Sequence, residues 1–489
     1  MSDTQARHTP GSGAAVPLDL DALRSALDRT ERRPDGTSSS LQPLQMSEAS
    51  IGPGALDRLG DVVAALGASP GEVVILAATT PITVRGSVLR DVVESQLAPR
   101  YPLRWVVLGP ADGLVHADEA TVTAARNGAA DADCVITVGS GTICDIGKAA
   151  APPGVPLLVV QTATSVNGYA DPFSVLLKSG VKRTTPTRWP DALIADTEVL
   201  LDAPDRLARA GLGDMAAMFT ATADWYVAAL LPAEGPPYLP EVTDLVRPHG
   251  EAMLSLGGGL ATDPDRLADL ARLLTLSGIG MGVTGSTAPA SGMEHAVSHL
   301  LEMAATATGA PASLHGEQVG VASIVAAATW AHVRGRIAAG ALDVDARLPD
   351  PDIMGERIGA AFGSLDPTGA MAAECLADYA AKIRLLAAAD DPLAPLRACW
   401  ADCDAALGRL LTGPADLAAG LASAGLPVRF GDLPEPIDDV LARWAVANCA
   451  LQRRRFGVAD LAMLMGAWED EDVAGVLAAA ETAAGRGTS

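Results

Sequence analysis

Apolar and polar positions along this chain follow two different patterns, and the change between them falls near residue 200. Before it, short β-branched runs bounded by Gly, Pro or Thr alternate with amphipathic stretches. Such runs indicate buried strands and the stretches between them indicate helices, so their alternation predicts an α/β domain with a parallel sheet. The expected strands are Val73–Ala78, Leu103–Leu108, Cys134–Val138, Val155–Val160 and Ala192–Ala195, and the expected helices are Ala55–Leu66, Gly86–Gln96, Glu119–Ala130 and Thr142–Ala150.

After residue 200 the helical pattern continues with few interruptions. We expect helices within Ala203–Leu231, Val319–Ala338, Ile358–Ala388, Ala394–Leu411 and Val440–Trp468, with loops over 340–357 and 412–436. Residues 1–45 are rich in Ser, Thr, Pro, Gly and charge, which predicts a disordered tail with one short amphipathic piece near Leu18–Leu27. The pattern therefore divides the chain into a tail (1–45), an α/β domain (46–200) and a helical domain (201–489).

Composition narrows the possible partners and the compartment. The 489-residue chain has a mean hydropathy of +0.24, but no uninterrupted apolar run reaches the length of a membrane span. Its net charge of −24 would repel a nucleic acid, so any basic cradle for a phosphate must be local. The short basic run Arg453–Phe456 is more typical of a solvated face than of a binding site. Six cysteines without CxxC spacing, and no signal-peptide pattern, favour a reduced cytoplasm.

Three of the seven histidines lie within Gly285–Gly320. His295 and His299 are four residues apart in a segment with helical apolar spacing, so they project from one helix face, one turn apart. His315 follows a Gly/Pro break, at the start of the next apolar run. Two imidazoles on a helix and a third at the next element suit a metal site with one further ligand. The alternative is that these are partly buried histidines that hydrogen-bond to backbone.

A glycine turn follows the predicted strand Cys134–Val138. Gly139, Ser140 and Gly141 form this turn, and a helix starts at Thr142. A strand, a glycine turn and a helix N-terminus present backbone N–H groups and the positive end of a helix dipole to a phosphate. The alternative is a tight turn that simply needs glycine, because GSG is shorter than the GxGxxG fingerprint. The Thr/Ser-rich loop 161–174 follows the next strand, at the edge of the sheet where open α/β folds bind ligands.

Asp214 is a carboxylate in a stretch otherwise rich in Ala, Met, Phe and Trp. Burial of an unpaired charge is costly, so two interpretations remain open. Either Asp214 meets a cation, or it caps a helix that begins after Gly213.

The segments VGSGTICDIGK, QTATSVNGYADP, GLGDMAAMFTATADW, SGMEHAVSH and LHGEQVG follow one another along the chain. In this order they resemble the glycerol-1-phosphate dehydrogenases, which belong to a superfamily with iron-containing alcohol dehydrogenases, glycerol dehydrogenases and dehydroquinate synthases. The likeness runs from Leu56 to Val473 and is strongest between Asp133 and Val321. It implies an α/β N-terminal Rossmann-like dinucleotide-binding domain followed by an all-α metal-binding domain, with the active site in the cleft between them.

The resemblance also implies roles for the matching positions. One divalent metal would be bound, and the ligand set leaves zinc, nickel and iron open. His299 would contact the substrate and could relay its proton. The implied metal ligands are Asp214, His295 and His315; the catalytic residues are His299, Asn167 and Asp214; and the cofactor-binding residues are Gly139, Ser140, Gly141, Thr142, Asp145, Thr162, Thr164, Ser165 and Asp171.

The activity that the resemblance implies is a metal-dependent, NAD(P)-linked dehydrogenase. Its substrate would be a polyol or polyol phosphate, most like glycerol 1-phosphate and dihydroxyacetone phosphate. We further expect a cytoplasmic homo-oligomer without a nucleic-acid partner or a membrane span.

Three positions depart from the family pattern. Asn167 replaces an aspartate expected to contact the substrate, and Asp171 replaces a small hydroxyl residue. No acidic residue follows the first strand in Ala77–Thr80, so the usual discrimination against a 2′-phosphate is missing and NADP is as open as NAD. A different alcohol substrate, a dehydroquinate-synthase-like cyclase or a cofactor-binding protein without turnover are the alternatives. The cyclase is disfavoured because its Lys- and Arg-rich active-site segments are not evident.

Overall fold

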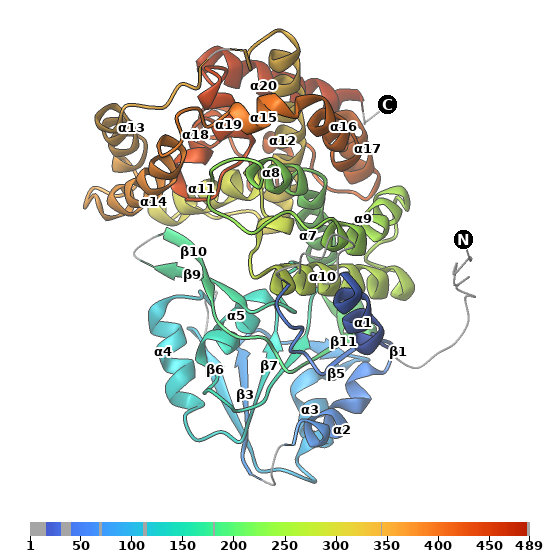
Figure 1. The fold of residues 1–489 in the computed structure, drawn as a ribbon. Helices are drawn as coiled ribbons and strands as arrows, with labels where there is room; N and C mark the ends of the chain where they lie inside the picture. Colours follow the sequence, from blue (N-terminus) through green and yellow to red (C-terminus); the bar gives the residue numbers. More distant parts are fainter. Residues whose placement is uncertain are drawn as a thin grey trace.

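The computed structural model describes residues 16–30, 41–67, 71–110, 115–178, 181–343 and 345–486. A sheet flanked by helices forms one half, and helices alone form the other (Figure 1). The predicted fold class is confirmed. The sheet strands are β1 (Val16–Pro17), β2 (Glu48–Gly52), β3 (Val73–Ala78), β6 (Leu103–Leu108), β7 (Cys134–Gly139), β8 (Leu157–Gln161) and β11 (Ala192–Asp196). Two hairpins pair β4 (Thr83–Val84) with β5 (Ser87–Val88) and β9 (Phe173–Lys178) with β10 (Val181–Pro186).

The seven-stranded sheet has the order β1-β2-β11-β8-β7-β3-β6 and is parallel except for β1. From β3 the chain first crosses to β6 on one side and then to β7 on the other. The strand order therefore reverses between β3 and β7, and the GSG turn follows β7 directly. Open α/β sheets bind ligands at the carboxyl ends of the strands at such a switch point.

Alternate residues of β3 cover the two faces of the sheet. Val73 and Ile75 pack with α2 (Leu59–Ala65) and α3 (Leu89–Leu97), whereas Val74 and Leu76 pack with α4 (Glu119–Gly128) and α5 (Gly141–Ala150). All four side chains are fully buried. A strand that is covered on both faces needs apolar residues at every position, which is why this run shows no alternation.

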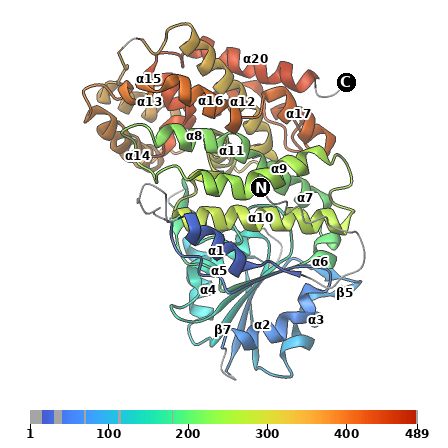
Figure 2. The ribbon, with the colours of Figure 1, turned by 45° about the vertical axis from the view of Figure 1, so that its right-hand side comes forward.

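The helical half begins after β11. In Figures 1 and 2, α10 lies between the sheet and most of the later helices. Among the described residues, α10 is the one helix long and apolar enough to cross a membrane. Its most apolar 18-residue stretch is 89% buried inside the fold. The helices of this half are α6 (Thr197–Asp202), α7 (Asp205–Met215), α8 (Ala221–Ala228), α9 (Pro240–Ser255), α10 (Pro264–Thr284), α11 (Met293–Thr308), α12 (His315–Ala338), α13 (Pro351–Gly363), α14 (Ala370–Ala387), α15 (Ala394–Ala398), α16 (Trp400–Leu410), α17 (Pro414–Ser423), α18 (Asp439–Asn448), α19 (Val458–Leu464) and α20 (Asp470–Arg486). Short 3₁₀ turns are η1 (Ala55–Arg58), η2 (Ala216–Phe219), η3 (Ala288–Ala290), η4 (Phe430–Asp432) and η5 (Cys449–Gln452).

The described part of the predicted tail is ordered. β1 pairs with β2, and α1 (Leu20–Thr30) packs on the helical half through Leu20 and Leu27, which are 4% and 8% exposed. Leu44 is buried as well. The tail interpretation is therefore corrected for 16–30 and 41–45, because the amphipathic piece has an apolar surface to cover; 1–15 and 31–40 lie outside the described residues.

Two predicted loops also contain helices. α13 lies partly within 340–357, and α17 lies within 412–436. Both helices start with a proline that follows the N-cap residue, a position at which proline favours a helix rather than breaking it.

Candidate active site

Close packing of α7 on α12 brings the predicted ligands Asp214 and His315 together. A side chain at Gly316 would come within 1.8 Å of the Ala210 carbonyl oxygen, and one at Gly213 within 2.2 Å of the Gly316 carbonyl oxygen. Glycine at both positions lets the two backbones touch. Asp214 lies inside α7 rather than at a helix start, so the capping interpretation is wrong. His315 is the first residue of α12.

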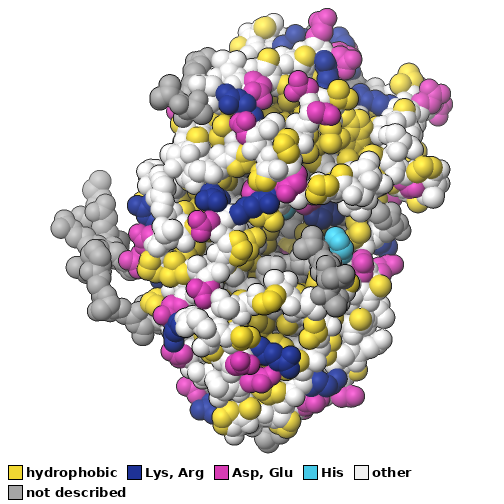
Figure 3. Space-filling view, turned by 180° about the vertical axis from the view of Figure 1, so that it is seen from behind, with side chains coloured by type: hydrophobic (Ala, Val, Ile, Leu, Met, Phe, Trp, Pro, Cys, Tyr) yellow, Lys and Arg dark blue, Asp and Glu magenta, His cyan; other side chains and the backbone are white. Residues whose placement is uncertain are grey.

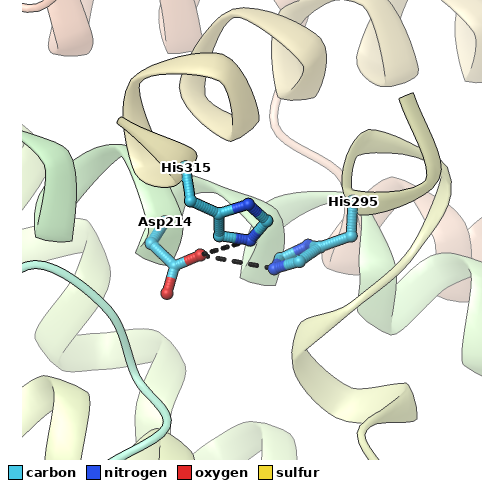
Figure 4. Close-up of side chains that lie close together, drawn as sticks. All are labelled: Asp214, His295 and His315. Atoms are coloured by element: carbon cyan, nitrogen blue, oxygen red, sulfur yellow. Dashed lines mark ion pairs between the residues drawn. The ribbon is translucent and has the colours of Figure 1, made fainter. Parts of the chain in front are cut away.

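Asp214, His295 and His315 point toward one another from α7, α11 and α12 (Figure 4). Asp214 Oδ1 lies 3.3 Å from His295 Nε2 and 3.8 Å from His315 Nε2. This oxygen is buried and makes no hydrogen bond within the described part of the chain. Two atoms that bind one tetrahedral ion at ~2.1 Å are about 3.4 Å apart. The spacing, and a buried oxygen that accepts no hydrogen bond from the described residues, therefore fit a divalent metal with a coordination position left open.

Further polar groups orient both imidazoles toward this point. His295 Nδ1 lies 3.1 Å from Glu294 Oε1, and the buried Glu294 carboxylate also accepts hydrogen bonds from Thr220 Oγ1 at 2.8 Å and from the Gly292 N–H at 2.5 Å. His315 Nδ1 lies 3.1 Å from Ser298 Oγ. Partners on Nδ1 leave Nε2 of each ring for a metal, an arrangement typical of metal-binding histidines.

Electrostatics determine the protonation of this set. Burial acts to raise the pKa of Asp214, but the neighbouring His295 and His315 lower it overall, so Asp214 is a carboxylate. Burial acts against a charge on His295, but Asp214 and Glu294 raise the pKa of His295 to about 9. Without a metal, His295 is therefore the cation next to Asp214, and a divalent ion would have to displace its proton.

His299 lies one turn after His295, and its ring stacks on that of His315 with 5.4 Å between centroids. Burial, with the neighbouring His315 and Lys182, lowers the pKa of His299 well below its usual value, so the ring is neutral. His299, Glu302 and His315 form a second group with metal-ligand spacing. Lys182 already pairs with Glu302 at 2.6 Å, which favours the Asp214 group as the metal site.

The loop after β8 reaches this set through Asn167. The Asn167 backbone N–H donates to Asp214 Oδ2 at 2.9 Å, and its side-chain amide donates to Ser277 Oγ at 3.2 Å. Both residues are buried. One carboxylate thus faces the two imidazoles with one oxygen and the predicted cofactor loop with the other.

The GSG turn is packed tightly against its surroundings. A side chain at Gly139 would come within 2.7 Å of Ile143, and one at Gly141 within 2.6 Å of Val166. These close contacts are by themselves enough to require glycine at both positions. Ser140 is the N-cap of α5, yet its side chain caps no backbone N–H. The helix start, which also includes Thr142, is thus without a side-chain cap, as a pyrophosphate site requires.

The remaining predicted cofactor residues divide into two groups. Thr162, Thr164 and Ser165 lie in the loop next to the GSG turn, and the Thr162 N–H donates to the Gly139 carbonyl at 3.1 Å. Asp145 and Asp171 instead both lie 3.1 Å from the buried Lys148 Nζ. Their carboxylates also accept hydrogen bonds from the backbone of β9, at Val175 and Phe173 respectively. The structure thus shows Asp145 and Asp171 fastening the β9–β10 hairpin to α5, and their cofactor contact stays a prediction.

Sequence reasoning missed two features of the site. Glu294 was detectable, since a carboxylate next to a candidate ligand in a helical apolar run has to find a partner. A pocket of about 350 Å³ was not detectable, because residues from β10, the loop before α11 and 452–456 line it together with His299. In Figure 3 the surface is hollowed between the two halves, with Lys and Arg side chains on the helical side of the hollow.

Comparisons with known proteins identify the family of this chain. A sequence profile described as iron-containing alcohol dehydrogenase matches residues 50–204. The glycerol-1-phosphate dehydrogenase [NAD(P)+] of Bacillus licheniformis is 37% identical over 289 residues, which are 56% of this chain and 71% of the relative. The enzyme of the same name from Archaeoglobus fulgidus is 32% identical over 210 residues, or 42% of this chain and 58% of the relative.

Solved structures share the fold over most of their length. Glycerol dehydrogenase from Schizosaccharomyces pombe aligns with a TM-score of 0.56 and 15% identity, over 92% of each chain. Maleylacetate reductase from Agrobacterium tumefaciens aligns with a TM-score of 0.53 and 17% identity, over 92% of this chain and 99% of the other. Such low identity supports the architecture alone. The identity and coverage of the Bacillus licheniformis relative go further, and this chain belongs to the glycerol-1-phosphate dehydrogenase family of iron-containing alcohol dehydrogenases.

Proposed function

We propose that this protein is a metal-dependent, NAD(P)-linked dehydrogenase that interconverts a polyol phosphate and its keto form, most like glycerol 1-phosphate and dihydroxyacetone phosphate. The observation that carries the proposal is the buried Asp214 Oδ1, which accepts no hydrogen bond from the described residues and lies between two imidazole Nε2 atoms. The other oxygen of the same carboxylate is bonded to the loop at the carboxyl end of β8. The metal ligands and the sheet edge suited to a dinucleotide therefore meet at one residue.

Asp214, His295 and His315 would hold the metal, and the GSG turn with Thr142, Thr162, Thr164 and Ser165 would hold the dinucleotide. When bound, a divalent ion polarises the substrate oxygen and the nicotinamide exchanges a hydride with the carbinol carbon. Oxidation of the alcohol also releases the hydroxyl proton. His299 is neutral and lines the pocket beside His315, so its ring can hydrogen-bond the hydroxyl and relay that proton without keeping it.

The test is a reconstitution screen. The metal-free protein is loaded with zinc, nickel or iron and assayed with both cofactors on glycerol 1-phosphate, its enantiomer, dihydroxyacetone phosphate, glycerol and dihydroxyacetone. We expect reversible NAD(P)H turnover on a polyol phosphate, and loss of both turnover and bound metal in His315→Ala. His332→Ala is the matched control, since His332 lies on the same helix but pairs with Asp472 away from the site. A redox-neutral product would indicate a cyclase instead, and bound cofactor without turnover a binding protein.

The Asn167→Asp variant tests whether the substrate is the family's usual one. Its backbone bonds to Asp214 and its amide to Ser277, so residue 167 lies next to the metal ligands. If the usual substrate is used, Asn167→Asp should keep or raise kcat/KM for glycerol 1-phosphate. If the asparagine marks a changed substrate, the added charge must be desolvated or paired and should weaken the native reaction. Identical specificity profiles would mean that residue 167 does not touch the substrate.

The division of the chain at residue 200 and the compartment are part of the same proposal. The division is supported by the sheet, whose last strand ends at Asp196. A cytoplasmic location is supported by the six cysteines, all of which are free thiols. Homo-oligomeric assembly stays a prediction, which light scattering on the metal-loaded protein would test.

A further inference from the structure

We propose that Arg453 and Arg455 form the subsite that binds the phosphate of the substrate, in the pocket that His299 also lines. The inference rests on the proposed function for the direction in which the substrate lies. It reverses the expectation that the run Arg453–Phe456 is a solvated face: Arg453 and Arg455 are partly buried, and Arg454 is the exposed member.

The first step is the charge of the pocket. Five basic side chains line it, together with His299 and the two acidic residues Glu234 and Asp378. The chain as a whole carries a net charge of −24, so such a basic lining is local. An anionic substrate group would be repelled by most of this protein and attracted here. The basic lining residues are Lys182, Arg183, Arg453, Arg454 and Arg455.

The second step separates the paired cations from the unpaired ones. Lys182 pairs with Glu302 at 2.6 Å, and Arg454 pairs with Glu234 at 2.7 Å. Arg183 pairs with Glu374 at 2.8 Å and with Asp378 at 3.2 Å. Three of the five positive charges are thus compensated inside the protein.

Arg453 and Arg455 form no ion pair with any carboxylate of the described residues, and neutral groups hold them instead. Arg455 donates from Nη1 to the Ser291 carbonyl at 2.6 Å and from Nη2 to Thr287 Oγ1 at 2.6 Å. Arg453 donates from Nη2 to the Gly292 carbonyl at 2.5 Å and from Nη1 to Ser291 Oγ at 3.4 Å. These contacts orient both guanidinium groups and leave further N–H donors for a ligand.

The nearby buried carboxylates are committed elsewhere. Glu294 bonds to His295 and Thr220, and Asp224 accepts hydrogen bonds from the Met293 N–H and Trp330 Nε1. Burial and the adjacent charge of Arg453 lower the pKa of Arg455 to about 9, despite the longer-range attraction of Glu294 and Asp224. Two adjacent, partly buried cations are costly without an anion, and a phosphate would supply that anion.

Geometry then selects the kind of anion. Two guanidinium groups line the same pocket and keep several N–H donors between them, which suits the three terminal oxygens of a phosphate monoester. The same pocket is lined by His299, whose ring stacks on the metal-ligand candidate His315. A short polyol phosphate can therefore place its carbinol at the histidine and its phosphate at the two arginines.

The experiment compares Arg455→Gln and Arg453→Gln with Arg454→Gln, a control from the same run with the same change of charge. Steady-state constants of the metal-loaded protein are measured for glycerol 1-phosphate and for glycerol. We expect KM for glycerol 1-phosphate to rise at least 30-fold in Arg455→Gln and Arg453→Gln while kcat/KM for glycerol changes less than threefold. Arg454→Gln should resemble the wild type. Arg455→Lys keeps the charge and should recover part of the affinity, and melting temperatures verify folding.

A second readout does not depend on turnover. Binding of inorganic phosphate to the metal-free protein, measured by calorimetry, should be lost in Arg455→Gln and kept in Arg454→Gln. If wild type binds phosphate there but oxidises no polyol, the proposed function fails and the subsite stands. Parallel losses on glycerol 1-phosphate and glycerol, or unchanged phosphate binding in Arg455→Gln, would overturn the subsite.

Discussion

Replacing Glu294 with glutamine would remove one negative charge from the group that orients His295, with almost no change in shape. Glu294 is fully buried, and Oε1 lies 3.1 Å from His295 Nδ1. Glutamine can still accept hydrogen bonds from the imidazole and from the Gly292 N–H through its one carbonyl oxygen. The substitution therefore isolates the electrostatic contribution of Glu294 to metal binding.

The magnitude follows from the distances. The 3.1 Å contact, the width of the imidazole and a metal–nitrogen bond place the carboxylate about 6.5 Å from the ion. The divalent ion brings two positive charges to the site, and His295 loses one when its proton leaves. Metal binding therefore adds about one net positive charge near Glu294. At an effective dielectric constant of about 20 this interaction amounts to ~2.5 kcal/mol, or roughly 70-fold in Kd. Measured effects of such indirect partners, about 10- to 100-fold, bracket this value.

The assay is competition of the metal-free protein with a chromophoric chelator for zinc and nickel, at one pH and ionic strength. Glu317→Gln is the control, because Glu317 is equally buried but pairs with Arg206 and touches neither imidazole. Its metal affinity should stay within threefold of wild type. An unchanged Kd in a folded Glu294→Gln protein, or an equal loss in Glu317→Gln, would refute the reasoning.

Three further predictions concern the cofactor turn, the contact between α7 and α12, and the buried carboxyl group of Asp145. Ser140→Asp supplies a good N-cap and should keep or raise Tm, yet its charge faces the predicted pyrophosphate, so Kd for NAD(P)H in a fluorescence titration should rise at least tenfold; an unchanged Kd would place the cofactor elsewhere. Gly316→Ala puts a methyl 1.8 Å from the Ala210 carbonyl oxygen and should lower Tm by many degrees with loss of bound metal, whereas Gly335→Ala on the same helix meets no atom within 4 Å and should not lower it. Burial raises the pKa of Asp145 from 3.8 to about 6, so its contribution to stability is present at low pH and is lost as pH rises from about 4 to 6. The free energy of unfolding, measured with denaturant at pH 4 and pH 6, should therefore fall less in Asp145→Asn than in wild type. An identical fall in both proteins would contradict this pH dependence.

Sequence patterns identified the sheet well where strands are buried on both faces. The predicted bounds of β3 agree with the structure residue for residue, and so do those of the less buried edge strand β6. The same reasoning missed β2 and the β9–β10 hairpin, because these strands mix polar and apolar residues and depend on partners far along the chain. It also missed α17 and the start of α13, which lie in stretches expected to be loops.

For the site, the sequence by itself determined which residues share a helix face. The four-residue spacing of His295 and His299 places both on one side of α11 wherever that helix packs. Only the tertiary structure decided that Asp214 lies beside His315, because glycine contacts between α7 and α12 set that distance. Only the tertiary structure decided which arginines have no carboxylate as an ion-pair partner. Ion pairing depends on distances between residues remote in sequence, and folding sets those distances by packing rather than by local pattern.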